Sequence, residues 1–160
     1  MRTHLRLPVA LLAGAATVLL GASSVLASAD GVPFHATFSG SAAITGPYST
    51  AFAGTGQATH LGSITNDGRV QITGGDDSCP GGIANTHVEV LTAANGDTLT
   101  ITSLDVACPA GPGKYHGMGH WTVTGGSGRF SDATGSGSFV GSSDFVAGTF
   151  SITLAGTISR

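Results

Sequence analysis

Apolar and polar residues alternate along most of the chain after its first thirty positions. Residues 34–39 switch between apolar and polar side chains at every step, and residues 150–154 repeat this pattern near the C-terminus. A period of two is typical of strands that bury one face and expose the other. No stretch of the chain after the first thirty residues shows the spacing of an amphipathic helix, and Thr, Val, Ile and Gly dominate. The pattern therefore predicts an all-β protein.

Asn95-Gly96 lies between two alternating runs, which is the strongest short-range indication of a hairpin with a two-residue loop. With that loop, Val90 pairs with Ile101 on a mostly apolar face. His87 and Glu89 then share the opposite face. A slip of one residue would exchange the two faces, so the prediction of this register also predicts which side chains point inward.

Further turn sequences divide the chain into about eight short strands, with no linker between domains. They lie at residues 45–47, 66–68, 74–82 and 109–113. Because the apolar face continues to the last residues, and because closure removes exposed edges, we expect a single antiparallel β-barrel rather than a sandwich. The barrel domain is predicted to span residues 30–160.

Residues 1–29 have the organisation of a secretory signal peptide. Basic residues at the start precede an uncharged apolar run over residues 7–27, and small residues precede a cleavage site between Ala29 and Asp30. An uncleaved membrane anchor is the alternative. Cleavage predicts a secreted, extracellular protein with no membrane association. The leader and the bias towards Ala, Gly and Thr are typical of a bacterium with GC-rich coding.

Cys79 and Cys108 are the only two cysteines, and an exported chain reaches an oxidising compartment. A disulfide between them is therefore expected. In the chain-entropy account, closing a loop of this length stabilises the fold by about 3–4 kcal/mol. Metal ligation is the alternative, but no second pair of ligands lies nearby in the sequence.

The charge of the chain excludes two classes of partner. Removing Arg2 and Arg6 with the leader leaves four of the six basic residues, against nine acidic ones. Binding to nucleic acid or to an anionic membrane needs Lys and Arg clustered on one face, and the sequence has no such cluster. The mature protein is mildly acidic, and neither partner is expected.

The histidines are the first candidates for chemistry. His116 and His120 would share one face of a strand but stand about 13 Å apart, too far for one ion. A coil around Met118 is the alternative that would bring them together. His60 lies in an uncharged stretch beside glycine, where it either lines a cavity or bonds to the backbone. Trp121 is expected in the core.

No catalytic constellation emerges from the rest of the sequence. The chain lacks a Gly-x-Ser-x-Gly elbow, and its Gly-x-Gly segments are not followed by the third glycine and helix of a phosphate cradle. Asp76-Asp77 is expected to be a solvated pair. We therefore predict no catalytic residue, no cofactor and no metal. The candidate pocket residues are His60, Glu89, His120 and Trp121.

The segment Gly125-Gly126-Ser127-Gly128-Arg129-Phe130, followed by Ala133-Thr134-Gly135, resembles a glycine-rich motif of the allene oxide cyclase and dirigent barrels. Looser similarity, around residues 58–62 and 94–97, extends to a bacterial secreted branch of that superfamily. The resemblance implies an eight-stranded antiparallel barrel, often oligomeric, whose lumen can hold an apolar small molecule. The shared segment shapes a turn, so it carries over no catalytic residue.

Two functions remain open at this point. The first is a secreted, non-enzymatic barrel that binds a small apolar ligand or acts at the cell surface, with a homo-oligomer as one form. The second is a cyclase or isomerase that confines a hydrophobic substrate in the lumen. The expected inward residues look able to fill a small barrel; they include Val90, Ile101, Trp121, Val123 and Ile152. A packed interior favours a structural role, and a cavity with converging polar groups favours a ligand.

Overall fold

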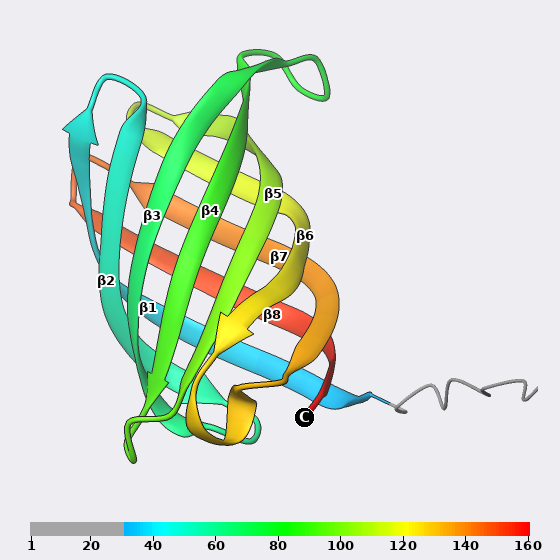
Figure 1. Cartoon of the computed structure of the whole chain (residues 1–160). Coiled ribbons are helices and arrows are strands. Elements are labelled where there is room, and N and C mark those ends of the chain that lie inside the picture. The colour runs from blue at the N-terminus through cyan, green and yellow to red at the C-terminus, as the bar shows by residue number, and fades with distance from the viewer. Residues whose placement is uncertain (1–30) are drawn as a thin grey trace, which may run out of the picture.

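A computed structural model describes residues 31–160, which form one closed barrel of eight antiparallel strands (Figure 1). The strands are β1 (Val32–Gly46), β2 (Ser49–Ala58), β3 (Gly62–Asp76), β4 (Gly82–Ala93), β5 (Thr98–Gly111), β6 (Lys114–Gly126), β7 (Thr134–Asp144) and β8 (Thr149–Ser159). A single 3₁₀ turn, η1 (Gly128–Phe130), precedes β7. The predicted all-β barrel is thus confirmed. The predicted signal peptide and its cleavage site at Ala29 and Asp30 lie outside the described residues.

Each strand pairs with its neighbour in sequence, and β1 closes the barrel by pairing with β8. The β1–β2, β3–β4, β5–β6 and β7–β8 connections gather at one end, which we call the open end. The other end, the closed end, holds the remaining connections, η1 and the C-terminus (Figure 1). Among the described residues, no helix has the length and apolar character needed to cross a membrane.

Alternation predicted the inward face of most strands correctly. Phe34, Ala36 and Phe38 of β1 are buried, as are Ile152 and Leu154 of β8. Inward rings and branched side chains form one continuous hydrophobic core, to which the expected Ile101 and Trp121 belong and against which Val123 packs in part. The edge of the Trp121 ring system meets Phe34, with ring centroids 5.4 Å apart. Most of the core residues lie in the half of the barrel next to the closed end.

The predicted register of the β4–β5 hairpin is wrong by one residue. Val90 pairs with Thr100, and Glu89 pairs with Ile101. The loop has three residues, because the N–H of Gly96 donates to the carbonyl of Ala93 and Gly96 adopts a φ of 88°. A turn followed by a residue in the left-handed region is the usual three-residue hairpin loop.

This slip exchanges the two faces of β4. His87 and Glu89 point into the barrel and are buried, whereas Val88 is 44% exposed. Val90, predicted to point inward, lies on the outer face and is only partly buried. The error matters for function, because the residues assigned to the wet face of this strand are the polar groups of the interior.

The glycine-rich segment after β6 seals the closed end. Gly128 adopts a φ of 59°, a conformation that glycine enters without a Cβ penalty. The resulting 3₁₀ turn places Phe130, which is fully buried, in the hydrophobic core. This segment therefore shapes the packed half of the barrel.

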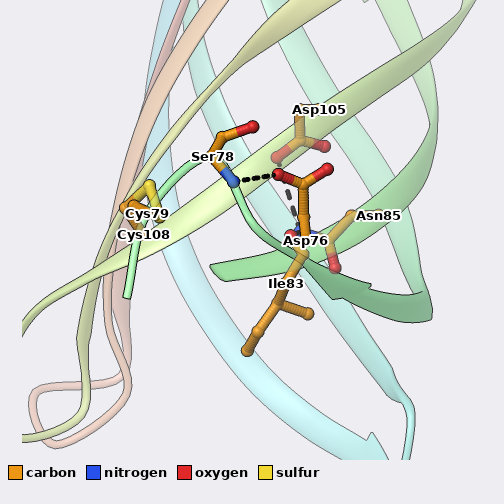
Figure 2. Close-up of a disulfide and its surroundings, with 7 residues drawn as sticks. All are labelled: Asp76, Ser78, Cys79, Ile83, Asn85, Asp105 and Cys108. Atoms are coloured by element: carbon orange, nitrogen blue, oxygen red, sulfur yellow. Dashed lines mark hydrogen bonds between the residues drawn. A yellow bond between two sulfur atoms is a disulfide. The ribbon is translucent and has the colours of Figure 1, made fainter. Parts of the chain in front are cut away.

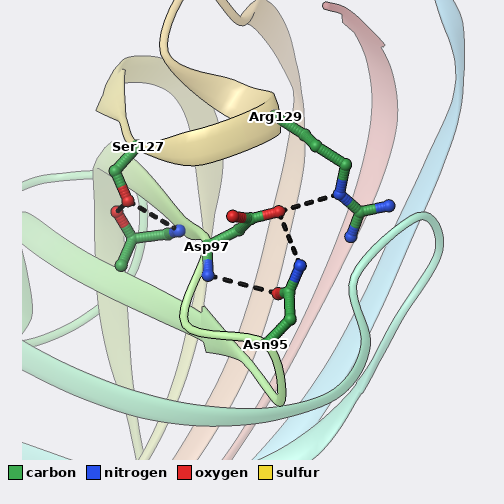
Figure 3. Close-up of polar contacts among 5 residues, drawn as sticks. Asn95, Asp97, Ser127 and Arg129 are labelled. Atoms are coloured by element: carbon green, nitrogen blue, oxygen red, sulfur yellow. Dashed lines mark hydrogen bonds and ion pairs between the residues drawn. The ribbon is translucent and has the colours of Figure 1, made fainter.

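Polar contacts hold the η1 segment against the β4–β5 loop (Figure 3). The guanidinium Nε of Arg129 donates to Asp97 at 2.8 Å, and the side-chain amide of Asn95 donates to the same carboxylate. The Oγ of Ser127 accepts from the backbone N–H of Thr98 at 3.1 Å. These contacts fix two consecutive closed-end connections to each other.

At the open end, a disulfide joins Cys79 to Cys108, as expected (Figure 2). Cys79 lies in the loop between β3 and β4, and Cys108 lies near the end of β5. The N–H of Ser78 donates to the carboxylate of Asp76 at 2.8 Å within the same loop. The disulfide therefore anchors the longest open-end loop to the barrel wall.

Replacing both Cys79 and Cys108 with Ser should lower the free energy of unfolding by about 3–4 kcal/mol, because the unfolded chain regains the entropy of an open loop. Urea denaturation of the oxidised wild type and the double variant measures the difference. Adding reductant should lower the stability of the wild type to that of the variant and leave the variant unchanged. Equal stabilities of oxidised and reduced wild type would contradict this prediction.

Candidate functional site

A cavity of about 200 Å³ lies inside the open end of the barrel. Its walls are largely apolar and include five aromatic side chains: Phe52, Tyr115, Phe139, Phe145 and Phe150. Ile44, which is 69% exposed, also borders it, so the cavity reaches the surface at this end. The interior is thus packed towards the closed end and hollow towards the open end.

One side of the cavity is polar. Asn85 and His87 of β4 and Asp105 of β5 line it and form what we call the polar wall. Each of the three residues is less than a tenth exposed. The Nε2 atom of His87 lies 2.9 Å from Oδ1 of Asp105. The side-chain amide of Asn85 donates a long hydrogen bond of 3.4 Å to the other carboxylate oxygen.

A second carboxylate lies one step deeper on β4. Glu89 is 2% exposed, and its Oε1 is 3.6 Å from Nδ1 of His87, beyond the usual range of a hydrogen bond. The amide of Asn66 donates a short hydrogen bond to Oε2 of Glu89. His87 is therefore flanked by two carboxylates inside the barrel.

Burial alone would favour neutral imidazole at His87. The contact with Asp105, supported by Glu89, outweighs that effect and raises the pKa of His87 to about 9. His87 is therefore an imidazolium at neutral pH. Since Asp105 and Glu89 flank it, the interior carries one buried cation between two acidic groups.

Aromatic rings fix the position of the imidazolium. Phe52 stacks on the His87 ring with centroids 6.1 Å apart and an angle of 15° between the planes. Phe139 meets the same ring nearly edge-on at 5.0 Å. A cation over an aromatic face, as His87 lies over Phe52, is favourable, and the two ring contacts leave His87 little freedom to rotate.

Two inward glycines make room for the carboxylates. A Cβ atom on Gly68 would lie 3.2 Å from the carboxyl group of Glu89, and one on Gly117 would lie 3.0 Å from Oδ2 of Asp105. Both approaches are tighter than most real Cβ contacts. The neighbouring strands β3 and β6 thus accommodate the buried acids by lacking side chains where the carboxylates stand.

The four predicted pocket residues have different places in the structure. Glu89 belongs to the buried polar cluster beneath the cavity, and Trp121 belongs to the packed core. His60 lies in the β2–β3 turn at the closed end, where its Nε2 is 3.1 Å from the carbonyl of Pro33. His120 is exposed on the outer face of β6. None of the four lines the cavity itself.

His116 and His120 lie on a continuous strand and are both exposed. Over residues 31–160, no three His, Cys, Asp or Glu side chains are arranged to hold a metal ion. The alternative of a coil around Met118 is therefore wrong.

Sequence reasoning missed Asn85, His87 and Asp105 as one site. A usable indication existed in the alternation itself, because Asp105 is in phase with Ile101 and continues the inward face of β5. On β4, His87 is in phase with the buried Leu91. The prediction of a two-residue loop placed His87 on the opposite face of β4, so this agreement in phase between the two strands was not recognised.

The fold and site define a closed up-and-down barrel with one packed end, one hollow end and a buried charged cluster between them. Comparison of the chain with protein-family models, with curated proteins and with solved structures finds no match.

The raised pKa of His87 makes the stability of the protein dependent on pH. The native state holds a proton that the unfolded state releases above about 6.5, so stability is fully present below that pH and is lost as the pH rises through about 9. We expect the free energy of unfolding to fall by on the order of 3 kcal/mol across this window. Urea denaturation at pH 6 and at pH 9.5 measures it.

His87→Gln is the informative variant, because a neutral amide cannot titrate. Its stability should change far less between the two pH values, whereas exposed His116→Gln should leave the wild-type slope intact. A wild-type slope that persists in His87→Gln would show that another group is responsible.

Proposed function

We propose that this protein is a secreted, non-enzymatic barrel that binds a small, mainly apolar molecule in its open end. The observation that supports it most directly is the cavity of about 200 Å³, whose apolar walls converge on a few buried polar groups. Ligand pockets have this composition, since apolar walls supply affinity and a few polar groups supply orientation.

The size of the cavity limits the ligand. An engineered protein cavity of about 150 Å³ binds benzene, so a cavity of about 200 Å³ suits one ring with a short substituent. The rings of Phe52, Phe139 and Phe150 border the cavity and would pack against such a ligand. A long-chain lipid would have to extend out of the mouth.

The polar wall would orient the bound molecule. A carboxylate can accept about four hydrogen bonds, and Asp105 has only the contacts with His87 and Asn85. Asp105 lines the cavity, and its remaining acceptor capacity is the proposed partner of the ligand's polar group. A ligand is therefore expected to place its polar group at Asp105 and its apolar part against the aromatic walls.

Filling the cavity tests this function. Ala107 lines the cavity, and the neighbouring Val106 points to the outer face of the same strand, so Ala107→Phe and the control Val106→Phe form a matched pair. Native mass spectrometry of the wild type and of Val106→Phe should show a co-purifying small molecule, which Ala107→Phe should lack. At a ligand concentration 100-fold above Kd, binding should stabilise the native state by about 2.7 kcal/mol.

Thermal unfolding of each variant, with and without the identified molecule, supplies the control for folding. Binding that survives unchanged in Ala107→Phe would contradict the proposal. So would the repeated absence of any bound molecule from the wild type.

A second candidate is a cyclase or isomerase, and the observation that favours it is the His87–Asp105 pair at the cavity surface. An imidazolium held by a carboxylate can donate a proton to a substrate oxygen and recover it afterwards.

Conversion of the co-purifying molecule to an isomer of equal mass, followed by chromatography, separates the two candidates. An enzyme should lose this conversion in His87→Gln while still binding the molecule, because the amide keeps the volume and loses the acid. For a binding protein, the molecule should be recovered unchanged from both wild type and variant.

A further inference from the structure

The aromatic lining of the cavity has a chemical preference beyond its hydrophobicity. Five of the ten Phe, Tyr and Trp residues of the chain border this one cavity. Aromatic faces carry negative charge density and attract organic cations, which is how aromatic-lined sites recognise alkylated ammonium groups. A cavity that binds apolar ligands with no preference for their charge could equally well have aliphatic walls.

The acidic groups add to this preference. Asp105 lines the cavity, and Glu89 lies beyond His87 in the same cluster. Both are almost completely buried, so water screens them poorly. His87 is the single cationic side chain among the lining residues, and two carboxylates stand on either side of it. The cluster as a whole is negative when all three groups are charged.

Charges at the open end have the same sign. Asp76 ends β3, Asp77 begins the β3–β4 loop, and Asp144 ends β7. Lys114 is the one basic residue at this end among the Lys and Arg residues described. Hydrogen bonds from Ser78 hold the pKa of Asp76 below its ordinary value, so this carboxyl is ionised.

Asp144 is ionised for a comparable reason. Backbone N–H groups, that of Ala147 above all, and the ammonium of Lys114 lower its pKa. At the closed end, by contrast, Asp97 and Asp132 are balanced by Arg129 and Arg160. Because Lys114 pairs with Asp144, the excess of negative charge lies at the open end, at Asp76 and Asp77 on the side of the β3–β4 connection.

We infer that the ligand is an organic ammonium compound, with its charged nitrogen at Asp105 and its apolar part among the aromatic walls. This inference rests on the proposed function and specifies the ligand class of the same cavity. An N–H of a protonated amine would donate to the free acceptor positions of the Asp105 carboxylate. A carboxylate ligand would instead meet the Asp105 carboxylate directly, while the imidazolium of His87 is already engaged by Asp105 and Glu89, which is unfavourable.

Three probes of similar size and different charge test this assignment: 2-phenylethylamine, 2-phenylethanol and phenylacetate. Each carries one ring and a short arm, as the cavity volume requires. Isothermal titration calorimetry with the purified protein at pH 7 measures each Kd. We expect the amine to bind at least about tenfold more tightly than the alcohol, and the acid to bind most weakly.

The same titrations with the Asp105→Asn variant test whether Asp105 is responsible for the preference for the amine over the alcohol. The variant keeps the shape of the side chain, so the alcohol should bind as before while the amine loses about tenfold in affinity. Asp132→Asn makes the same change of charge at an exposed position of the closed end, and it should alter the affinity for neither the amine nor the alcohol. Because Asp105 is buried, thermal unfolding must show that the variant folds.

If Asp105→Asn does not fold, half-buried Asp76→Asn replaces it. This variant should lose less amine affinity, and added salt should reproduce the loss in the wild type. Equal binding of amine and alcohol, or tighter binding of the acid, would overturn the ammonium assignment and leave the binding function standing. Failure of all three probes to bind, together with no co-purifying molecule, would overturn both.

Discussion

Pairing of the first strand with the last determines what the interior of this protein can be. Because β1 bonds to β8 along ten residue pairs, the sheet has no free edge, and every second side chain is directed into one limited space. Eight strands leave an interior that side chains fill or that one small ligand occupies. In this barrel, bulky rings fill one end, and a cavity remains at the other.

A polar cluster separates these two halves. His87 lies between the carboxylates of Asp105 and Glu89, and removing one member would leave the others buried and unpaired. Gly68 and Gly117 on the flanking strands give the carboxylates the space they need. Such a cluster is a costly way to fill a core that apolar residues could occupy, so its position at the cavity favours a functional role over a structural one.

The fold could be predicted from the sequence because a period of two persists in nearly every strand. The alternation predicts Ile101, Trp121 and Ile152 in the interior, where they lie, and the two cysteines indicate the disulfide. A barrel of this kind depends on local alternation and short hairpins, which single-sequence patterns capture well. The hollow end could not be predicted in the same way, since volume depends on how eight strands meet.

The site was missed for a more specific reason. A loop of two residues and a loop of three give opposite faces to β4, and Asn95-Gly96 is compatible with both. Polarity then favoured the wrong choice, because His87 and Glu89 look like surface residues beside Val88 and Val90. Functional interiors violate the apolar rule, and sequence patterns fail where that rule is broken.

The single tryptophan gives this molecule an intrinsic fluorescence signal that reports on one part of the barrel. Trp121 is 1% exposed and packs against Phe34 in the sealed half, away from the hollow half. Its indole emission therefore responds to loss of core packing and to the entry of water. Ligand binding at the open end should change this emission only if it deforms the whole barrel. Tryptophan fluorescence can therefore follow denaturation, and ligand binding must be measured by other methods.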